Sequence, residues 1–153
     1  MKIVVVSDSH RRSDGLEKIL LSNSDSDLFI HCGDLEGADV FAAQFLAVKG
    51  NNDFRSDLPP NRIITFDGVK FFITHGDQFH YGARIDELLT KGKEEKCDIV
   101  CFGHTHKPFM KKIDGIWLLN PGSLLYNRDA SKIGYIVINT DNGKILDIER
   151  VIL

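Results

Sequence analysis

Short apolar runs in this chain end in clusters of aspartate, asparagine and histidine. Residues 3–6 are followed by Asp8 and His10, and residues 99–101 lead to His104 and His106 through Gly103. Side chains two positions apart on an extended backbone point the same way, so we expect His104 and His106 to project together from a strand end. Two imidazoles presented in this way suit a transition metal. The pattern predicts a fold in which strand ends carry metal ligands.

The first half of the chain alternates between strand and helix patterns. Continuous apolar runs predict buried strands at 3–6, 27–30 and 46–49. Between them we expect one helix with a capping box formed by Asp14 and Glu17, and a second over residues 38–45. In open α/β sheets, ligands bind at the carboxyl ends of such strands.

Hairpins dominate the second half. Residues 62–66 and 69–74 flank Asp67-Gly68, a pair typical of a two-residue type I′ turn. Further elements are expected as a helix at 84–95, strands at 98–102 and 117–119, a hairpin around residues 114–115 and a C-terminal pair at 135–139 and 144–153. The sequence therefore predicts an α/β fold, a four-layer α-β-β-α sandwich of two mixed β-sheets with flanking helices, as a single domain over residues 1–153.

Charge and cysteine content limit the partners and the compartment. The net charge is −3 over 153 residues, so we expect no stable binding to duplex nucleic acid. The first apolar stretch is too short for a signal peptide or a membrane span, and we expect no membrane association. Cys32, Cys97 and Cys101 show no C-x-x-C spacing. We expect them to be reduced thiols in a cytoplasmic protein.

The strand ends together offer seven side chains that could hold metal ions. They are four imidazoles, two carboxylates and one carboxamide, namely His10, His75, His104, His106, Asp8, Asp34 and Asn51. Seven ligands are too many for one ion and enough for two ions that share a bridging carboxylate. Mixed nitrogen and oxygen donors favour Mn, Fe, Co, Ni or Zn over Ca or Mg.

The ordered motifs D-x-H, G-D, G-N, H-G and G-H-x-H resemble those of the calcineurin-like metallophosphoesterases. Together with the Asn-Pro-Gly-Ser at 120–123, they look most like the small bacterial and archaeal phosphodiesterase branch. The resemblance implies one ion bound by Asp8, His10, Asp34 and His106. It implies a second ion bound by Asp34, Asn51, His75 and His104, with Asp34 as the bridge. The implied reaction is hydrolysis of phosphodiester bonds by a hydroxide that bridges two divalent ions, most simply manganese.

One position departs from the family pattern. Many members carry a histidine directly after the Gly-Asn asparagine as general acid, where this chain has Asn52, which has no proton of suitable pKa. We therefore expect activated diesters to be cleaved more readily than unactivated monoesters, and Asp53 to serve as a hydrogen-bonding group. Asn51, Asn52 and Arg128 are candidates for binding the substrate.

Two other functions remain open at this point. The same ions would serve a phosphomonoesterase or nucleotide phosphatase, and the retromer subunit is similar in fold but is a non-catalytic protein-binding scaffold. We expect an enzyme acting on a small phosphodiester or phosphorylated substrate, because a scaffold has no need of four converging histidines. Of the other histidines, His31 is expected to be a satisfied core residue and His80 a solvated loop residue. An edge strand near the C-terminus would allow a homo-oligomer, although nothing in the sequence requires one.

Overall fold

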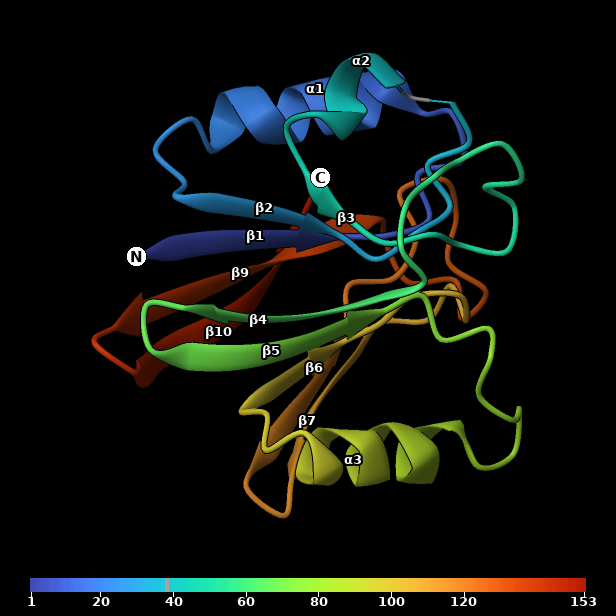
Figure 1. Cartoon of the computed structure of the whole chain (residues 1–153). Coiled ribbons are helices and arrows are strands. Elements are labelled where there is room, and N and C mark those ends of the chain that lie inside the picture. Colours follow the sequence, from blue (N-terminus) through green and yellow to red (C-terminus); the bar gives the residue numbers. More distant parts are fainter. Residues whose placement is uncertain (38) are drawn as a thin grey trace.

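The computed structural model describes residues 1–37 and 39–153. Two five-stranded sheets pack face to face, and helices cover their outer faces (Figure 1). The expected four-layer sandwich of two mixed sheets is therefore confirmed. None of the helices in these two ranges has the length and apolar character that crossing a membrane requires.

The first sheet combines strands from both ends of the chain. Its strands are β1 (Lys2–Val6), β2 (Leu28–His31), β3 (Leu46–Ala47), β9 (Gly134–Asp141) and β10 (Lys144–Ile152). They lie in the order β10-β9-β1-β2-β3, with β1 parallel to β2 and antiparallel to β9. Helices α1 (Ser13–Ser22) and α2 (Asp39–Ala42) lie over its outer face.

The second sheet is built from the middle of the chain. Its strands are β4 (Asn61–Phe66), β5 (Val69–Thr74), β6 (Ile99–Cys101), β7 (Phe109–Ile113) and β8 (Ile116–Asn120). They lie in the order β4-β5-β6-β8-β7, and β6 runs parallel to both β5 and β8. Helix α3 (Arg84–Glu94) covers the outer face.

The continuous apolar run of β1 follows from burial on both faces. Ile3 and Val5 belong to the core between the two sheets, whereas Val4 and Val6 pack in the cluster beneath α1. Each of these four side chains is fully buried. At roughly 25 cal/mol per Å² of apolar surface, this double burial fixes β1 in the middle of its sheet. The end of β1 that leads to Asp8 and His10 is thereby held in a rigid setting.

The two sheets are also bonded to each other at one edge of the sandwich. Asp67 and Gly68 have φ angles of 48° and 76°, which confirms the type I′ turn between β4 and β5. The Asp67 carboxylate accepts a hydrogen bond from Thr140 Oγ1 at 2.7 Å, and its carbonyl accepts one from the Gly143 amide at 2.7 Å. The turns of two hairpins from different sheets therefore lie against each other. This contact is at the end of the sandwich where β1 and β5 begin.

Several expected boundaries were wrong. The structure shows no capping box: α1 begins at Ser13, its N-cap is Arg12, and Asp14 lies in the first turn, where it accepts a hydrogen bond from Arg12 Nε at 3.0 Å. Helix α2 spans only 39–42 of the expected 38–45, and Ala38 lies outside the described residues. Strand β3 is two residues long, although the Val48 amide still donates to the His31 carbonyl. The three cysteines are buried free thiols, as expected.

Candidate metal centre

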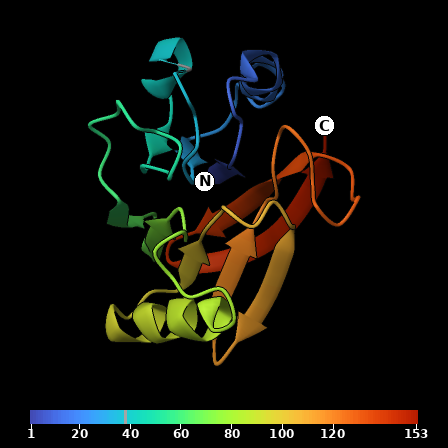
Figure 2. The ribbon, with the colours of Figure 1, turned by 90° about the vertical axis from the view of Figure 1, so that its right-hand side faces the viewer.

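The predicted ligands lie on loops that leave the two sheets at one end of the sandwich. The loops after β1, β2 and β3 come from the first sheet, and those after β5 and β6 come from the second. Figure 2 shows this end of the molecule facing the viewer, with segments from both halves of the chain meeting there. The parallel strands of each sheet place their carboxyl ends together.

Most of these ligands have a left-handed backbone conformation. Positive φ angles between 44° and 65° occur at Asp8, His10, Asp34, His104 and His106. Such angles are uncommon outside glycine, but aspartate and histidine tolerate them better than most residues. A left-handed residue breaks the two-residue alternation of an extended strand. The expectation that His104 and His106 project together was therefore wrong: β6 ends at Cys101, and the two rings have different neighbours.

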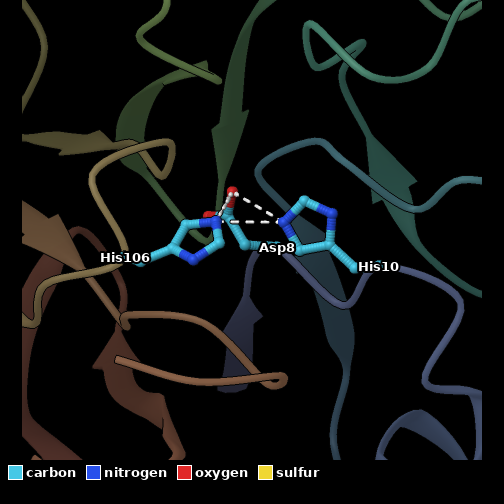
Figure 3. Close-up of side chains that lie close together, drawn as sticks. All are labelled: Asp8, His10 and His106. Carbon is cyan, nitrogen blue, oxygen red and sulfur yellow. Dashed lines mark hydrogen bonds and ion pairs between the residues drawn. The ribbon is translucent and has the colours of Figure 1, made fainter. Parts of the chain in front are cut away.

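The first group consists of Asp8, His10 and His106 (Figure 3). His106 Nε2 lies 3.2 Å from Asp8 Oδ1 and 3.0 Å from His10 Nε2. His10 Nδ1 donates to the Glu36 carboxylate at 2.6 Å, so in the neutral ring Nε2 carries the lone pair and faces the group. Within the described part of the chain, no donor bonds to the buried Asp8 Oδ1 or to His106 Nδ1. An unbonded buried carboxylate oxygen beside two imidazole nitrogens fits a divalent cation.

The second group consists of Asp34, Asn51, His75 and His104. Asn51 Oδ1 lies 3.0 Å from His75 Nε2 and 3.0 Å from His104 Nδ1. His75 Nδ1 donates to the Cys32 carbonyl at 2.7 Å, so its Nε2 faces oxygens of Asn51, of Asp34 at 3.4 Å and of Asp8 at 4.0 Å. Four potential ligand atoms from both sheets thus converge.

The electrostatics of both groups favour a positive charge. Burial disfavours the charged form of His75, but the hydrogen bond to Asp34 and the charges of Asp8 and Asp34 raise its pKa to about 9. Burial also opposes ionisation of Asp8 and Asp34, yet the neighbouring histidines hold the pKa of each carboxyl below its usual value. His104 differs, because burial and the nearby charge of His75 lower its pKa. The ionised carboxylates of Asp8 and Asp34, which are 0% and 2% exposed to solvent, strongly attract cations.

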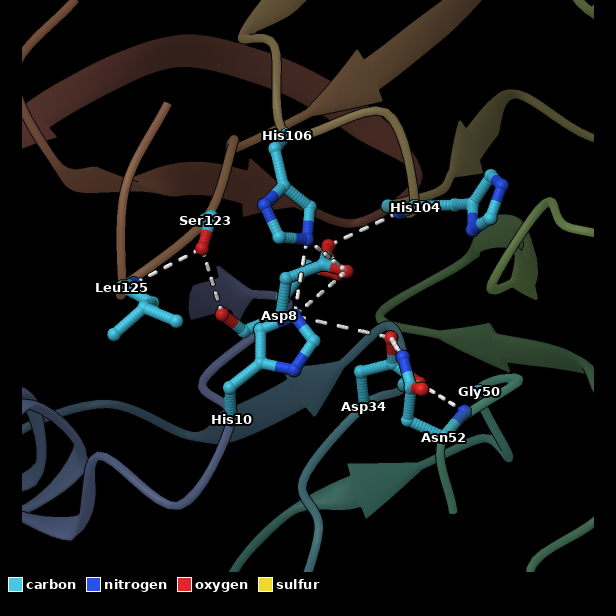
Figure 4. A network of polar contacts seen from close by, with 12 residues as sticks. Asp8, His10, Asp34, Gly50, Asn52, His104, His106, Ser123 and Leu125 are labelled. Atoms are coloured by element: carbon cyan, nitrogen blue, oxygen red, sulfur yellow. Dashed lines mark hydrogen bonds and ion pairs between the residues drawn. The ribbon is translucent and has the colours of Figure 1, made fainter. Parts of the chain in front are cut away.

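Asp34 belongs to the second group and also approaches His10 of the first, beside which Figure 4 shows it. Its Oδ2 is 3.8 Å from His10 Nε2 and 3.4 Å from His75 Nε2. The Asn52 backbone amide donates to Oδ1 and the Asn52 side-chain amide donates to Oδ2, each at 2.8 Å. The structure thus places the Asn52 side chain on Asp34, a contact that the sequence did not suggest for this residue.

Two further carboxylates hold the ligand loops in place. Asp53 accepts the backbone amides of Asp34, Glu36 and Gly50, each at 2.8 Å, in agreement with its expected hydrogen-bonding role. Glu36 orients His10, and a carboxylate bonded to the second nitrogen of a metal-binding imidazole is a frequent arrangement. Sequence reasoning missed Glu36. The only available signal was an acidic residue two positions after the Gly-Asp motif.

The Asn-Pro-Gly-Ser segment ties the loops of both sheets together. Asn120 Nδ2 donates to the Gly103 carbonyl at 2.9 Å, and Ser123 Oγ donates to the Asp8 carbonyl at 2.8 Å. Figure 4 shows Ser123 between Asp8 and Leu125, whose backbone amide donates to the serine oxygen. The segment thus fixes the positions of two ligand loops.

The remaining candidates lie outside the two groups. His31 accepts the Gly33 amide on Nδ1 and bonds Ser9 Oγ through Nε2, and burial lowers its pKa to about 4, so it is the expected satisfied core histidine. His80 is exposed and pairs with Glu87. Arg128 is exposed, and it lines the cavity over the ligands together with Asn51, Asn52 and His104.

Replacing Asp53 by alanine is expected to lower the free energy of unfolding by about 2–4 kcal/mol, because three buried amides lose a charged acceptor. Thermal denaturation of the metal-free protein would measure this loss. Asp147→Ala, at an exposed carboxylate on β10, is the control and should change stability by less than about 0.5 kcal/mol. Equal stability of the two variants would contradict the role given to Asp53.

Known proteins resemble this chain in sequence and in fold. Residues 1–143 match the calcineurin-like phosphoesterase superfamily domain. A probable metallophosphoesterase of Methanocaldococcus jannaschii is 37% identical over 131 residues, which cover 80% of this chain and 68% of the relative. Another protein of that organism, named a phosphodiesterase, is 29% identical over 144 residues. The matched region covers 80% of this chain and 83% of that relative.

Solved structures agree with this result. A predicted phosphoesterase from Streptococcus pneumoniae superposes with a TM-score of 0.87 at 26% identity, over 99% of this chain and 88% of the other. Vps29 of Entamoeba histolytica, solved in complex with zinc, gives a TM-score of 0.75 at 23% identity over 99% of this chain and 98% of the other, which shows the fold alone. The family match over 143 residues and the 37% identical relative carry more weight. The chain belongs to the calcineurin-like phosphoesterase superfamily and is a hydrolase acting on phosphoric ester bonds.

Proposed function

We propose that this protein is a phosphodiesterase that depends on two divalent transition-metal ions. The observation that carries the proposal is the convergence of imidazole nitrogens, carboxylate oxygens and one carboxamide oxygen from both sheets on one small volume. We assign one ion to Asp8, His10, Asp34 and His106. We assign the other to Asp34, Asn51, His75 and His104, with Asp34 shared between them. Manganese is our first choice of metal because the carboxylate and carboxamide oxygens suit it, and the four imidazoles keep Ni, Fe, Co and Zn as alternatives.

The chain's own residues prepare the site for an anionic ester. Divalent ions held by these residues would supply Lewis-acid chemistry, namely activation of water near neutral pH and neutralisation of the phosphoryl charge. Asn51 contributes a neutral ligand atom, which leaves the positive charge of its ion undiminished. Asn52 fixes the orientation of the Asp34 carboxylate. Arg11 and Arg128 line the cavity above the ligands and are placed to pair with phosphate oxygens.

The cavities around the ligands support a diester over a monoester. The cavity above the ligands shares His104 and Arg128 with a second cavity on one side. It shares Arg11, Glu36 and Asn52 with a third cavity on the other side. A phosphodiester carries two organic groups on one phosphorus, and this arrangement offers a space for each. Asn52 supports the same choice, because it supplies no proton to a poor leaving group.

The proposal also includes a location in the cell and a domain organisation. Three buried free thiols support a reducing compartment, and we propose the cytoplasm. We propose that residues 1–153 act as one domain on a small phosphodiester. The relative named a phosphodiesterase supports the activity. The likeness to Vps29 makes a protein-binding scaffold the alternative that an experiment must exclude.

Metal reconstitution tests the activity directly. Protein stripped with a chelator would be given Mn, Ni, Zn or Mg one at a time and assayed on bis-p-nitrophenyl phosphate beside p-nitrophenyl phosphate. We expect a transition metal to restore hydrolysis and the diester to be cleaved at least about tenfold faster than the monoester, because a chain without a general acid depends on the leaving group. Faster cleavage of the monoester would favour a phosphatase. Metal binding without turnover on either substrate would favour the scaffold.

A further inference from the structure

The cavity beside His104 is a distinct space that opens from the ligand cavity. It has a volume of about 610 Å³ and lies between residues 81–86, at the start of α3, and residues 102–109, which follow β6. Its size falls in the range of small-molecule sites. His104 and Arg128 line both spaces, so a ligand whose phosphate lies over the metal ligands can extend into this cavity without leaving the protein surface.

Part of the lining of this cavity is aromatic and apolar. Phe102 and Phe109 stand with ring centroids 6.1 Å apart, and Pro108 lies beside them in the lining. Tyr81 lines the opposite side and is 91% exposed, so its ring is almost uncovered in the free protein. Exposed aromatic side chains at the mouth of a cavity offer a large rigid surface at low entropic cost.

The charges around the cavity nearly cancel. Lys107 and Arg128 contribute two positive charges to the lining, and Asp86 and Asp129 contribute two negative ones. Arg84 adds a third positive charge to the lining, but its guanidinium is occupied, because it donates to the Gly76 carbonyl at 3.0 Å and to the Phe79 carbonyl at 3.3 Å. A neutral group therefore fits this cavity better than a second phosphate does.

We propose that this cavity binds a neutral aromatic group on one ester arm of the substrate, with Tyr81 packed against that ring. The inference rests on the proposed function, because it takes the phosphate to lie over the metal ligands. An aryl ester and a nucleoside ester share this chemistry. They differ in the distance between phosphorus and ring, which an experiment can resolve.

Calorimetry with the metal-loaded protein tests the subsite without turnover. Methylphosphonate, phenylphosphonate and the methylenephosphonate analogue of thymidine 5′-phosphate have the same kind of head group and resist hydrolysis. We expect at least one of the two aromatic ligands to bind about tenfold more tightly than methylphosphonate, since a buried ring adds apolar contact. Preference for phenylphosphonate would indicate an aryl ester, and preference for the thymidine analogue would indicate a nucleoside ester.

Two exposed aromatic residues provide matched variants. Tyr81→Ala removes the ring proposed to contact the ligand, whereas Phe54→Ala removes an 81% exposed ring that lines the cavity on the other side. We expect Tyr81→Ala to reduce the aromatic preference at least threefold while the affinity for methylphosphonate is unchanged, a loss in the range of one aromatic contact. Phe54→Ala should retain the preference.

Four results would overturn the assignment. Equal affinity for all three phosphonates would remove the subsite and leave the proposed activity standing. Loss of the preference in Phe54→Ala alone would place the ring in the opposite cavity. Failure of every phosphonate to bind a metal-loaded protein that still hydrolyses bis-p-nitrophenyl phosphate would overturn the subsite alone. Absence of both binding and hydrolysis would overturn the proposed function, and the subsite with it.

Discussion

Replacing Asp8 by asparagine is expected to lower phosphodiester hydrolysis at least about 1000-fold, because the site loses one of its two charged ligands and several kcal/mol of charge stabilisation depend on the ions. The substitution keeps the shape of the side chain. Ser7 Oγ and the His104 amide both donate to Asp8 Oδ2, and an asparagine oxygen can accept both bonds. The new amide group would then face His106 Nε2, which can accept from it.

Three measurements on this variant separate chemistry from folding. Turnover of bis-p-nitrophenyl phosphate and metal content per chain should both fall, whereas the melting temperature of the metal-free protein should not. Asp147→Asn, at an exposed position on β10, provides the control and should keep full activity. Wild-type turnover in a purified, folded Asp8→Asn protein would remove Asp8 from the site.

A methyl group at Gly103 is expected to disturb the site for a steric reason. An added Cβ would overlap Ser7 Oγ and lie 2.6 Å from Asp8 Oδ2. The strand end that carries Asp8 and the loop that carries His104 and His106 would have to separate. We expect Gly103→Ala to cost about 1–3 kcal/mol of stability and to weaken metal binding at least about tenfold, as overpacking does in a rigid core.

Gly15 on α1 is the matched control for this substitution. A Cβ at Gly15 would meet only Leu153 Cδ2 at 3.6 Å, an ordinary contact. Gly15→Ala should therefore leave metal affinity unchanged and stabilise the helix by up to about 1 kcal/mol. Calorimetric titration with manganese and thermal denaturation would compare the two variants. Wild-type affinity and stability in Gly103→Ala would contradict the close approach of these two segments.

The position of the site could be predicted from the sequence because it depends on topology. Apolar runs identify buried strands, and parallel strands bring their carboxyl ends together whatever the loops do in detail. The order of the motifs then placed Asp8, Asp34 and His75 at one end of the sandwich before any contact was known. His75 Nε2 lies 4.0 Å from Asp8 Oδ1 and 3.4 Å from Asp34 Oδ2, which is consistent with that expectation.

The orientation of each ligand could not be predicted in the same way. The left-handed conformations at His104 and His106 depend on the hydrogen bonds of Asn120 and on contacts with the other sheet. Such long-range contacts leave no periodic pattern in the sequence. Glu36 was missed for the same reason, because its partner His10 lies 26 residues away. The early start of α1 also went undetected, since the exposed Arg12–Asp14 pair replaced the expected cap.

The contact between hairpin turns at Asp67 has a consequence for the opposite end of the molecule. Ligands on the first sheet and ligands on the second face each other across the interlayer gap, and the two layers are already joined where β1 and β5 begin. The layers are also bonded at the ligand end, where His75 Nδ1 donates to the Cys32 carbonyl and the His104 amide donates to Asp8 Oδ2. Between these two joints the spacing of the layers is set by the packed residues between the sheets, among them Ile30, Phe71 and Ile136. Because a close-packed interior transmits changes in volume, these apolar residues act as spacers that determine how far apart the ligand atoms stand.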